Sequence, residues 1–573
     1  MIQLIEPYGG LLKELYLTAG DAARYQDQAR EYPSWDLNPR QLCDLELLLN
    51  GAFSPLEGFL NQADYERVTA EMRLGDGTLW PMPVTLDVSE EFAQRITTGD
   101  TIALRDPEGV LIAVLEVGDL WRPDRLHEAQ QVFGSTDQRH PGVFQLLHRS
   151  GPVYVGGRVH GVASPVHYDF PQLRASPRQL RERFAQQGWP RVIAFQTDAP
   201  LLRAQQALSL HAMLQAEAAL LLHPTVGATG TDGLDHYARV RCYEQLLPNY
   251  PGQTAALNLL NLAPRWAGPR EALWRAIIQQ NYGCSHFIVS RDQASPDRTQ
   301  TGPAFYPHEA AQQLLAHYRR ELSIQILFYP EMVYVQERGQ YAFTNTVTAG
   351  ETALTLSDSE FRRRLQDGLD IPAWCADPAV VEELRRVHPP RQRQGFTVFL
   401  TGLSGSGKST IANALRVKLL ELGGRAVTLL DGDIVRKHLS SELGFSREHR
   451  NLNILRIGFV ASEITKNGGI AICAPIAPYA ATRREVREMI APLGGFVEVH
   501  VATPLEVCEA RDRKGLYAKA RAGLLKEFTG ISDPYEAPKH PELRIDTRDC
   551  SPGQAAERIL ATLEELGYLG GRV

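Results

Sequence analysis

The sequence lacks the features of a membrane protein, a secreted protein or a bulk nucleic-acid binder. No apolar run approaches the roughly 18 residues of a membrane span. The start MIQLIEPYGG has no basic segment before an apolar core, so we predict no secretory signal and no membrane partner. The seven cysteines form no C-x-x-C pair, which predicts neither a disulfide framework nor a structural metal. A net charge of −7 argues against nucleic acid as a partner, and we expect a cytoplasmic protein.

The chain also lacks internal repeats, and 573 residues are too many for one hydrophobic core. The clearest boundary is the segment 385–395, where Pro389 and Pro390 stand among basic and polar residues. Short apolar runs at 191–195 and 286–289 predict strands, a long stretch at 201–222 reads as helical, and 80–86 carries strand and turn signals. We predict four parts: a β-rich domain (1–165), an α/β domain (166–325), a small domain with a linker (326–390), and a second α/β domain (391–573).

The most specific motif is GLSGSGKST at 402–410, which fits the phosphate-binding pattern G-x-x-x-x-G-K-[ST] at every fixed position. The apolar run 396–400 before it predicts a strand, and apolar residues at four-residue steps after it predict a helix. A Gly/Ser linker would not carry Lys and Ser at this offset between a strand and a helix. The segment therefore predicts a nucleotide triphosphate site made by Gly402, Leu403, Ser404, Gly405, Ser406, Gly407, Lys408, Ser409 and Thr410.

Within this site, Lys408 is placed to reach the β- and γ-phosphates, and the Ser409 hydroxyl is placed to bind Mg²⁺. The strand predicted at 426–430 is followed by Asp431 and Asp433. Carboxylates at a strand end that faces the phosphate loop can hold Mg²⁺ through water or accept a proton from an attacking hydroxyl. Further buried strands are predicted at 470–476 and 496–501, which completes a parallel sheet.

Several separated motifs accompany this loop: GFSREHRNLN (444–453), ICAPIAPY (472–479), LYAKARAG (516–523), FTG (528–530) and DPYEAP (533–538). Together they resemble adenylyl-sulfate kinase over about 391–573. That family phosphorylates the 3′-hydroxyl of adenosine 5′-phosphosulfate (APS) with ATP. The resemblance implies a phosphate-loop kinase fold, ATP and APS as substrates, and Mg²⁺ with ATP.

The resemblance also implies residue roles. Asp433 matches the base, Asp431 a metal-side acid, and Lys408 the phosphate-binding lysine. Arg436, Arg450 and Asn453 match positions that contact the phosphosulfate and ribose of APS, and Ile476 matches a further APS-binding position. Phe445 and Phe528 match the aromatic pair that sandwiches the adenine of APS. Lys519 matches a basic residue that steadies the transferred phosphate. For the aromatic residues the alternative is core filling, and for the arginines a solvated helix face.

Two positions depart from the kinase family. The DRDEN-like stretch is here His449-Arg450-Asn451-Leu452-Asn453, which keeps the arginine and asparagine but not the acids. Some relatives carry a phospho-accepting serine at the position of Ala477. Because alanine has no hydroxyl, we expect direct transfer of the phosphoryl group to APS.

The stretches DLELLLNGAFSPLEGFL (44–60), LWPMPVTLDV (79–88), VRCYEQLL (240–247) and NYGCSHFIVSRD (281–292) resemble ATP sulfurylase over roughly 1–390. That family joins sulfate to the α-phosphate of ATP to make APS and pyrophosphate. The resemblance implies a β-rich, PUA-like N-terminal domain followed by a Rossmann-like α/β domain. Fusion of the two families would give a two-step enzyme that makes 3′-phospho-APS (PAPS).

The sulfurylase site residues differ from the family pattern. The family's Q-T-R-N-P loop and following H-x-x-H pair are here Gln196-Thr197-Asp198-Ala199-Pro200, then Leu202 and Gln205. G-R-D-H-A-G has become Ser290-Arg291-Asp292-Gln293-Ala294-Ser295. Replacing Arg by Asp beside a sulfate turns attraction into repulsion, each worth about 4 kcal/mol at a separation of about 4 Å with an effective dielectric constant near 20.

We therefore predict an active APS kinase on a catalytically silent sulfurylase scaffold. Three alternatives stay open: a bifunctional PAPS synthase, an N-terminal module that senses nucleotide or assembles the kinase, and a regulatory protein without either activity. The retained residues could still hold a nucleotide weakly, namely Gln196, Thr197, Arg203, Arg239, Arg241, Arg291 and Asp292. Because both families form oligomers, we expect a homo-oligomer, with a kinase dimer and sizes up to a hexamer.

Overall fold

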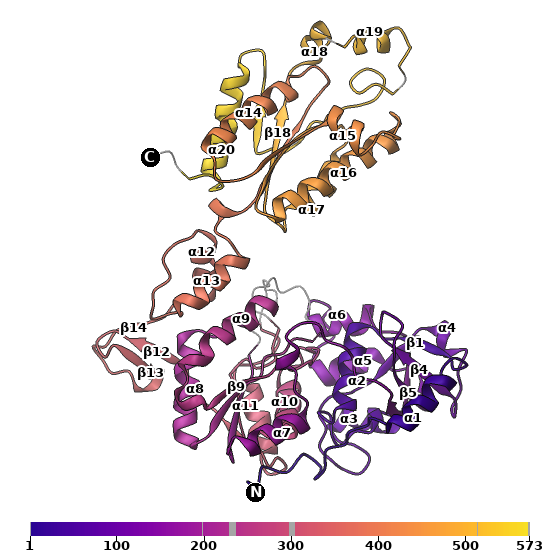
Figure 1. Cartoon of the computed structure of the whole chain (residues 1–573), viewed down its shortest axis with the longest axis vertical. Helices are drawn as coiled ribbons and strands as arrows, with labels where there is room; N and C mark the ends of the chain where they lie inside the picture. Colours follow the sequence, from indigo (N-terminus) through magenta and orange to yellow (C-terminus); the bar gives the residue numbers. More distant parts are fainter. Residues whose placement is uncertain are drawn as a thin grey trace. The chain divides into compact units, whose positions relative to one another are not determined.

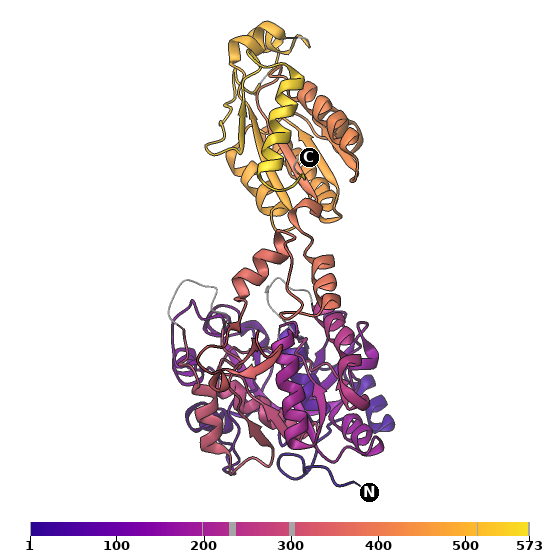
Figure 2. The same cartoon turned by 90° about the vertical axis from the view of Figure 1, so that its left-hand side faces the viewer.

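The computed structural model describes residues 2–197, 199–227, 236–296, 304–512, 514–525 and 527–570, without the side chain of residue 433. The chain divides into two compact units. The first comprises Met1–Leu356 and Pro372–Glu383, and the second comprises Ser357–Ile371 and Leu384–Val573. Figures 1 and 2 colour both units along the sequence.

The N-terminal part of the first unit is built on a six-stranded, mostly antiparallel sheet. The strand order is β1-β4-β5-β6-β2, and β3 also pairs with β6. Apolar side chains from these strands and the surrounding helices form one core that continues into the α/β part. The strands are β1 (Ser34–Asp36), β2 (Gly58–Phe59), β3 (Leu86–Val88), β4 (Thr101–Arg105), β5 (Leu111–Trp121) and β6 (Val153–Gly161); the helices are α1 (Ala19–Gln28), α2 (Pro39–Leu49), α3 (Gln62–Glu71), α4 (Glu90–Ala93), α5 (Arg125–Phe133) and α6 (Pro141–His148).

The strand and turn signals predicted at 80–86 are only partly a strand, because β3 begins at Leu86. Prolines at 81 and 83 cannot donate to a ladder, which keeps the preceding residues out of the sheet.

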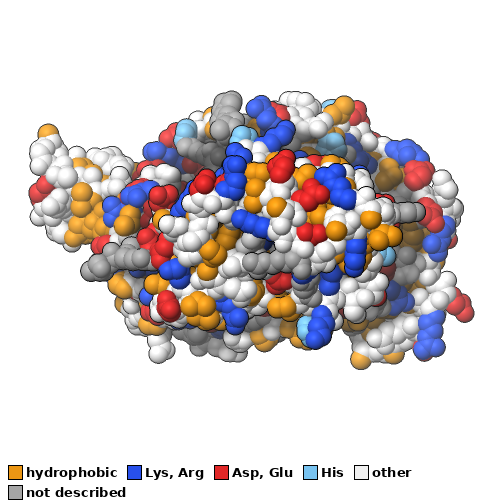
Figure 3. All heavy atoms as spheres, turned by 90° about the horizontal axis from the view of Figure 1, so that it is seen from above, with side chains coloured by type: hydrophobic (Ala, Val, Ile, Leu, Met, Phe, Trp, Pro, Cys, Tyr) orange, Lys and Arg blue, Asp and Glu red, His pale blue; other side chains and the backbone are white. Residues whose placement is uncertain are grey.

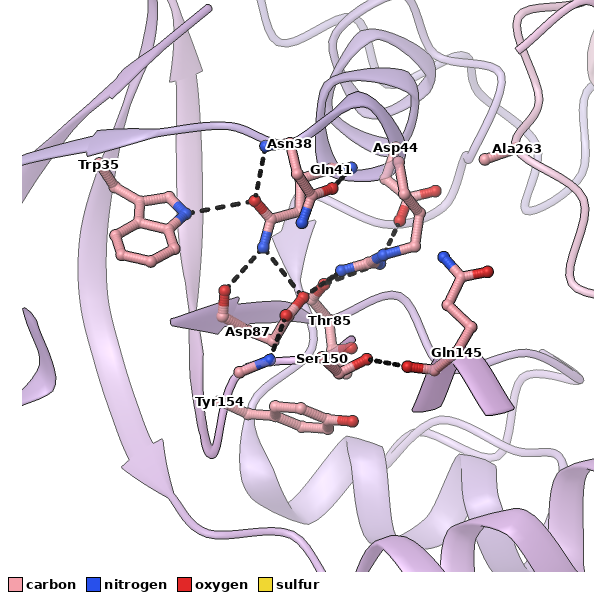
Figure 4. A network of polar contacts seen from close by, with 12 residues as sticks. Trp35, Asn38, Gln41, Asp44, Thr85, Asp87, Gln145, Ser150, Tyr154 and Ala263 are labelled. Carbon is pink, nitrogen blue, oxygen red and sulfur yellow. Dashed lines mark hydrogen bonds and ion pairs between the residues drawn. The ribbon is translucent and has the colours of Figure 1, made fainter. Parts of the chain in front are cut away.

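A buried polar network surrounds Asp44 and Asp87 in the β-rich part (Figure 4), and Arg265 connects it to the α/β part of this unit. Arg40 on α2 pairs with Asp44 at 2.8 Å and with Asp87 on β3. Arg265, from the α/β part, donates to both carboxylate oxygens of Asp44 at 2.7 and 2.6 Å. Because Asp44 is fully buried, these two guanidinium groups compensate a carboxylate that would otherwise be costly to bury.

The α/β part carries a five-stranded sheet in the order β11-β10-β7-β8-β9, and every pair in it is parallel. From β7 the chain adds β8 and β9 on one side of the sheet and then β10 and β11 on the other side. In sheets of this kind, ligands bind at the carboxyl ends of the two strands where the order switches, here β7 and β10. The strands are β7 (Val192–Phe195), β8 (Ala219–Leu222), β9 (Ala255–Leu257), β10 (His286–Ile288) and β11 (Gln325–Leu327); the helices are α7 (Pro177–Gln186), α8 (Arg203–Ala216), α9 (His236–Leu246), α10 (Pro269–Asn281) and α11 (Ala310–Tyr318).

The helical prediction over 201–222 is wrong at its end. Helix α8 stops at Ala216, Glu217 adopts a left-handed conformation with φ of 46°, and the remaining apolar residues form strand β8. A four-residue apolar run fits a helix face and a buried strand equally well, so the sequence pattern did not separate them.

A small antiparallel sheet in the order β13-β12-β14 completes the first unit. It consists of β12 (Met332–Val335), β13 (Gln340–Phe343) and β14 (Ala353–Leu354). Helix α12 (Asp358–Gln366) belongs to the second unit. Helix α13 (Pro378–Val387) runs into the segment predicted as a linker and ends just before Pro389 and Pro390. The prolines mark the end of the helix, whereas Arg385 and Arg386 are helical.

The C-terminal sheet has the order β16-β17-β15-β18-β19 and is parallel throughout. Alternate residues of β15 enter different cores: Phe396, Val398 and Leu400 pack with α14 and α20, and Phe399 packs with α16 and α17. Helices therefore cover both faces of the sheet (Figure 1). The elements are β15 (Phe396–Thr401), β16 (Val427–Asp431), β17 (Ile470–Ala474), β18 (Gly495–Val501), β19 (Leu543–Ile545), α14 (Lys408–Leu422), α15 (Gly432–His438), α16 (Arg447–Lys466), α17 (Ala480–Ile490), α18 (Leu505–Arg511), α19 (Leu516–Arg521) and α20 (Pro552–Glu565).

All four strands predicted in this region exist, with shifted ends. The largest shift is in β17, which stops at Ala474 instead of residue 476 because a proline follows. Basic and acidic side chains are interspersed over the face drawn in Figure 3. In the parts of the chain that are described, no helix combines the length and apolar character needed to cross a membrane.

Candidate active site

The phosphate-binding motif lies between β15 and α14, at the carboxyl edge of the parallel sheet. Gly405 and Gly407 have φ of 75° and 106°, a conformation that side chains disfavour. A Cβ atom on Gly405 would also lie 3.0 Å from the carbonyl oxygen of Cys508. Both glycines are therefore needed for the curvature of the loop, which brings backbone N–H groups toward the start of α14.

Lys408 is buried at the first position of α14. Its ammonium donates to the carbonyl oxygens of Gly402 at 2.9 Å and Leu403 at 2.7 Å. Burial lowers the pKa of Lys408 to about 8, and the nearby Asp431 carboxylate acts in the opposite direction. The lysine is thus a desolvated cation held inside the loop, where an anionic ligand would interact with it strongly.

Three side chains that the sequence did not indicate donate hydrogen bonds to backbone carbonyl oxygens of this loop. The Thr503 hydroxyl donates to Ser406 O at 3.0 Å, the Thr547 hydroxyl donates to the same oxygen at 3.1 Å, and Tyr517 donates to Ser404 O at 2.8 Å. Thr503 and Thr547 each come two residues after a strand, β18 and β19. For Thr503 the available signal was a polar residue just beyond the strand predicted at 496–501, whereas no strand was predicted before Thr547.

The acidic residues predicted for catalysis follow strand β16. Asp431 is its last residue, and its charge raises the pKa of Lys408 against the larger effect of burial. Ser409 and Thr410 are exposed in the first turn of α14. Residue 433 is the second residue of α15, but its side chain, the predicted base, lies outside the described part of the structure. Two hydroxyls and one carboxylate are oxygen donors of the kind that Mg²⁺ takes, which fits a metal-bound nucleotide at this edge.

Arg450 is the centre of a buried polar cluster on α16. It donates to the Thr529 hydroxyl at 2.7 Å and to the Tyr479 hydroxyl at 2.9 Å, and it lies 3.0 Å from Asp533. Tyr479 also donates to Asp533 at 2.7 Å. Sequence reasoning selected Arg450 but not its three partners, although Tyr479, Thr529 and Asp533 lie in the ICAPIAPY, FTG and DPYEAP motifs.

Asn453 lies one turn further along α16 and is 4% exposed. Among the described residues, its Oδ1 atom and the Nε atom of Arg450 have no hydrogen-bond partner. An unpaired buried polar atom costs about 1–3 kcal/mol, so each of these two atoms calls for a partner that the described residues do not supply. These two atoms lie on the helix that carries the predicted APS contacts.

The segment 475–479 crosses the carboxyl end of β15. Ile476 O accepts a hydrogen bond from the Thr401 hydroxyl at 2.7 Å. Ala477 is buried with φ of 46°, a strained conformation for a residue with a Cβ atom. Its methyl group packs in the core beside α16 and α17.

Phe445 and Phe528, the pair predicted to sandwich adenine, have other neighbours among the described contacts and do not stack on each other. Phe445 is 70% exposed, and the Arg436 guanidinium lies 4.5 Å from its ring centre. Phe528 packs edge-on against Tyr517 with ring centres 5.1 Å apart. Lys519 is exposed on α19. The sandwich stays a prediction.

The sulfurylase-like residues gather where the sheet of the first unit predicts a crevice. Gln196 and Thr197 follow β7, and Ser290 to Gln293 follow β10, its parallel neighbour. The Thr197 hydroxyl accepts from Ala199 N at 3.2 Å, and Tyr243 donates to Ala199 O at 2.6 Å. Residue 198, the predicted Arg-to-Asp replacement, lies outside the described residues.

Two replaced positions have local structural partners. Gln205 Oε1 accepts from Leu202 N at 2.9 Å and so caps the start of α8. Gln293 Oε1 accepts from the Ser290 hydroxyl at 3.1 Å within its own turn. Both amides are engaged in backbone support, as a capping or turn residue would be.

The retained arginines of the first unit are also engaged. Arg203 donates to Asp377 at 3.1 Å, Arg241 donates to Glu383 at 2.8 Å, and buried Arg239 donates to Thr225 O at 2.7 Å. Arg291 is exposed just beyond β10, and Asp292 lies 3.5 Å from His308.

Comparison with known proteins assigns these parts to families. A PUA-like domain matches residues 5–164, ATP-sulfurylase matches 171–387, and adenylylsulphate kinase matches 394–546. Sulfate adenylyltransferase of Phaeosphaeria nodorum is 48% identical over 569 residues, covering 98% of this chain and 99% of that protein. The protein of the same name from Mycosarcoma maydis is 48% identical over 565 residues, covering 97% and 98%.

The chain belongs to the sulfate adenylyltransferase family. In this member of the family an ATP-sulfurylase domain is followed by an adenylylsulphate kinase domain with a parallel sheet. A solved structure, the hexameric APS kinase from Thiobacillus denitrificans, is 42% identical with a TM-score of 0.81 and covers 99% of this chain and 100% of its own. The predicted fold class, with a PUA-like domain before the two α/β domains, is confirmed.

Proposed function

We propose that this protein transfers the γ-phosphate of MgATP to the 3′-hydroxyl of APS. The observation that carries the proposal is the complete phosphate loop, whose buried Lys408 is held at the start of α14 beside Asp431. Phosphoryl transfer needs cations and N–H groups placed before the charge develops, and the loop supplies both.

The remaining roles are assigned as follows. Ser409 and Asp431 would hold the Mg²⁺ that accompanies ATP, and the ion would offset negative charge on the phosphates. Asp433 accepts the proton of the attacking hydroxyl, and Lys519 steadies the transferred phosphoryl group. Arg436, Arg450, Asn453 and Ile476 bind APS, and Phe445 and Phe528 take its adenine. The unpaired buried atoms of Arg450 and Asn453 support the assignment to APS.

The kinase assignment is tested by the formation of PAPS from APS and MgATP. Lys408→Ala removes a cation from the transferring phosphates and should lower kcat/KM by at least about 100-fold. Purified protein that makes no PAPS, or a Lys408→Ala variant with unchanged kinetics, would contradict the proposal.

We further propose that the sulfurylase-like domain is catalytically silent and has a structural or regulatory role. Its charge-handling positions carry Asp198, Ala199, Leu202, Gln205 and Gln293 in place of the family residues, and two of these amides support local backbone. The alternative is a bifunctional PAPS synthase. The names of the 48% identical relatives favour this alternative, whereas the full-length relative of known structure is named for the kinase alone.

Sulfate-dependent exchange of pyrophosphate into ATP separates the two readings. A silent domain gives no exchange above a blank without protein, and a bifunctional enzyme gives sustained exchange. The assay should use the same preparation as the PAPS assay, so that a negative result is read against an active kinase.

We also propose that the protein is a homo-oligomer and that its first unit retains weak nucleotide binding. The relative of known structure is hexameric. The first unit keeps Gln196, Thr197 and Arg291 at the carboxyl ends of β7 and β10.

A further inference from the structure

A chain of buried hydrogen bonds runs along the carboxyl ends of three consecutive strands of the first unit. Asn258 follows β9, His223 follows β8 and Gln196 follows β7; Gln279 of α10 lies between the last two. Asn258, His223 and Gln279 are fully buried, and Gln196 is 2% exposed. We call these four residues the amide relay.

The order of hydrogen-bond donors and acceptors in the relay is fixed by its first member, Asn258. Ala175 N donates to Asn258 Oδ1 at 2.8 Å, and a backbone N–H can only donate. The amide nitrogen of Asn258 therefore faces Ala175 O at 3.1 Å and His223 Nε2 at 3.3 Å. Because the amide donates, His223 Nε2 must accept, and the neutral ring carries its proton on Nδ1.

The same logic passes through the next two links. His223 Nδ1 lies 2.8 Å from Gln279 Oε1, so the ring donates and Oε1 accepts. Gln279 then donates its Nε2 proton to Gln196 Oε1 at 3.2 Å. Burial lowers the pKa of His223 to about 4, which keeps the ring neutral and preserves this order of donors and acceptors near neutral pH.

The last group of the relay is a donor without a recipient. Within the described chain, Gln196 Nε2 is buried and has no hydrogen-bond partner. Its oxygen is already used by Gln279, so the amide cannot present an acceptor without breaking the relay. Gln196 directly follows β7, at the carboxyl edge beside β10 where sheets of this topology bind ligands.

We infer that Asn258, His223 and Gln279 are positioning residues that fix the Gln196 amide as a donor, and that the crevice accepts the oxyanion of a nucleotide. This inference rests on the proposed retention of nucleotide binding by the first unit. It adds a reason why Gln196 presents a donor and not an acceptor: the ligand must bring an acceptor oxygen to Gln196 Nε2, and a phosphate oxygen of ATP does so.

The relay suggests a substitution that reverses its output without changing its size. In Gln279→Glu the new carboxylate can only accept, so it takes protons from both His223 and the Gln196 amide. Gln196 must then rotate its amide and present Oε1 to the crevice, which repels a phosphate oxygen. We expect the affinity of the first unit for ATP to fall by at least about tenfold.

Gln280→Glu is the matched control. It adds the same carboxylate at the next position of α10, where Gln280 Oε1 accepts from Ser323 N at 3.3 Å and Ile324 N at 3.4 Å and takes no part in the relay. The order of donors and acceptors that ends at Gln196 is therefore unchanged, and the affinity should stay within about threefold of the original protein.

The experiment uses the full chain and 8-azido-ATP as a photoaffinity probe. Peptides from the first unit and from the kinase domain are quantified separately by mass spectrometry over a range of probe concentrations. Half-maximal labelling of the first unit should shift to at least tenfold higher concentration in Gln279→Glu, whereas labelling of the kinase peptides should not move in either variant.

Three outcomes overturn the inference: no saturable labelling of the first unit in the original protein, unchanged labelling in Gln279→Glu, or equal losses in Gln279→Glu and Gln280→Glu, which would show an effect of charge alone. None of these depends on PAPS formation or pyrophosphate exchange, so failure of the proposed function is recognised independently.

Discussion

Arg483 donates from Nη1 to the carbonyl oxygen of Ala477 at 2.7 Å and holds the strained residue of segment 475–479 in place. The same guanidinium donates to Glu498 Oε1 on β18 at 2.9 Å and to Glu536 O at 2.7 Å. Both side chains of the ion pair are buried. One arginine thus connects three segments around the predicted APS site, although no motif pointed to it.

Arg483→Met should destabilise the kinase domain by about 3 kcal/mol, because it leaves Glu498 buried without its main partner. It should also raise KM for APS more than KM for ATP, since Ala477 and Glu536 lose their common anchor. Denaturant unfolding of the kinase domain and initial rates check both effects. Arg484→Met, an exposed neighbour on α17, is the control and should stay within about 0.5 kcal/mol. Equal behaviour of the two variants would contradict the role of Arg483.

Nucleotide affinity should depend on pH through Lys408. Burial lowers its pKa from 10.5 to about 8 in the free protein, and bound phosphates favour the charged form. Affinity for a non-hydrolysable ATP analogue should therefore be level below pH 8 and fall as the pH rises above 8, with proton uptake on binding in that range. Calorimetry in two buffers of different ionisation enthalpy measures both quantities.

Lys408→Arg is the control for this pH dependence, because its guanidinium stays charged and should remove the break near pH 8. The sign for stability is opposite to that for binding. Unfolded Lys408 binds its proton more tightly than folded Lys408, so this residue destabilises the fold below pH 8, and the penalty fades as the pH rises toward 10.5. A break that persists in Lys408→Arg would assign it to another group.

The phosphate loop illustrates how much of the site the sequence could predict. Its glycines, Lys408 and flanking strand and helix follow from local spacing, and the structure has them in that order. Thr503, Thr547 and Arg483 could not be predicted in this way, because each acts through a contact with a segment that is distant in the sequence. The error at β8 has a different cause, since four apolar residues carry no period that separates strand from helix.

No phosphoenzyme should form on segment 475–479, because Ala477 has no hydroxyl and transfer goes directly to APS. Incubation with γ-labelled ATP without APS should leave the intact protein unmodified by mass spectrometry. Lys408→Ala serves as the blank for non-enzymatic labelling. Stoichiometric label on a peptide spanning 470–480 would exclude direct transfer.

Gln205→Ala should destabilise the first unit by about 1 kcal/mol, because the start of α8 loses the side-chain acceptor for Leu202 N. Gln186→Ala, at an exposed position of α7, is the matched control and should change stability by less than about 0.5 kcal/mol. Thermal unfolding of both variants measures the difference. If Gln205→Ala has no effect, the capping role is wrong and the residue is available for another function.

Separation of the units should leave the kinase active but reduce the size of the oligomer. A fragment of residues 391–573 keeps the whole β15 to β19 sheet, and Arg391 still donates to Leu566 O at 3.4 Å. It lacks α12 and the turn at Gly368, which packs against Pro390 in the same unit. A fragment of residues 357–573 retains both features and is the matched control for folding.

Light scattering after size exclusion gives the oligomer size, and PAPS formation gives the activity. If both fragments are active and smaller than the full-length assembly, the first unit holds kinase subunits together; if 391–573 alone keeps the full-length oligomer size, assembly is not the function of the first unit.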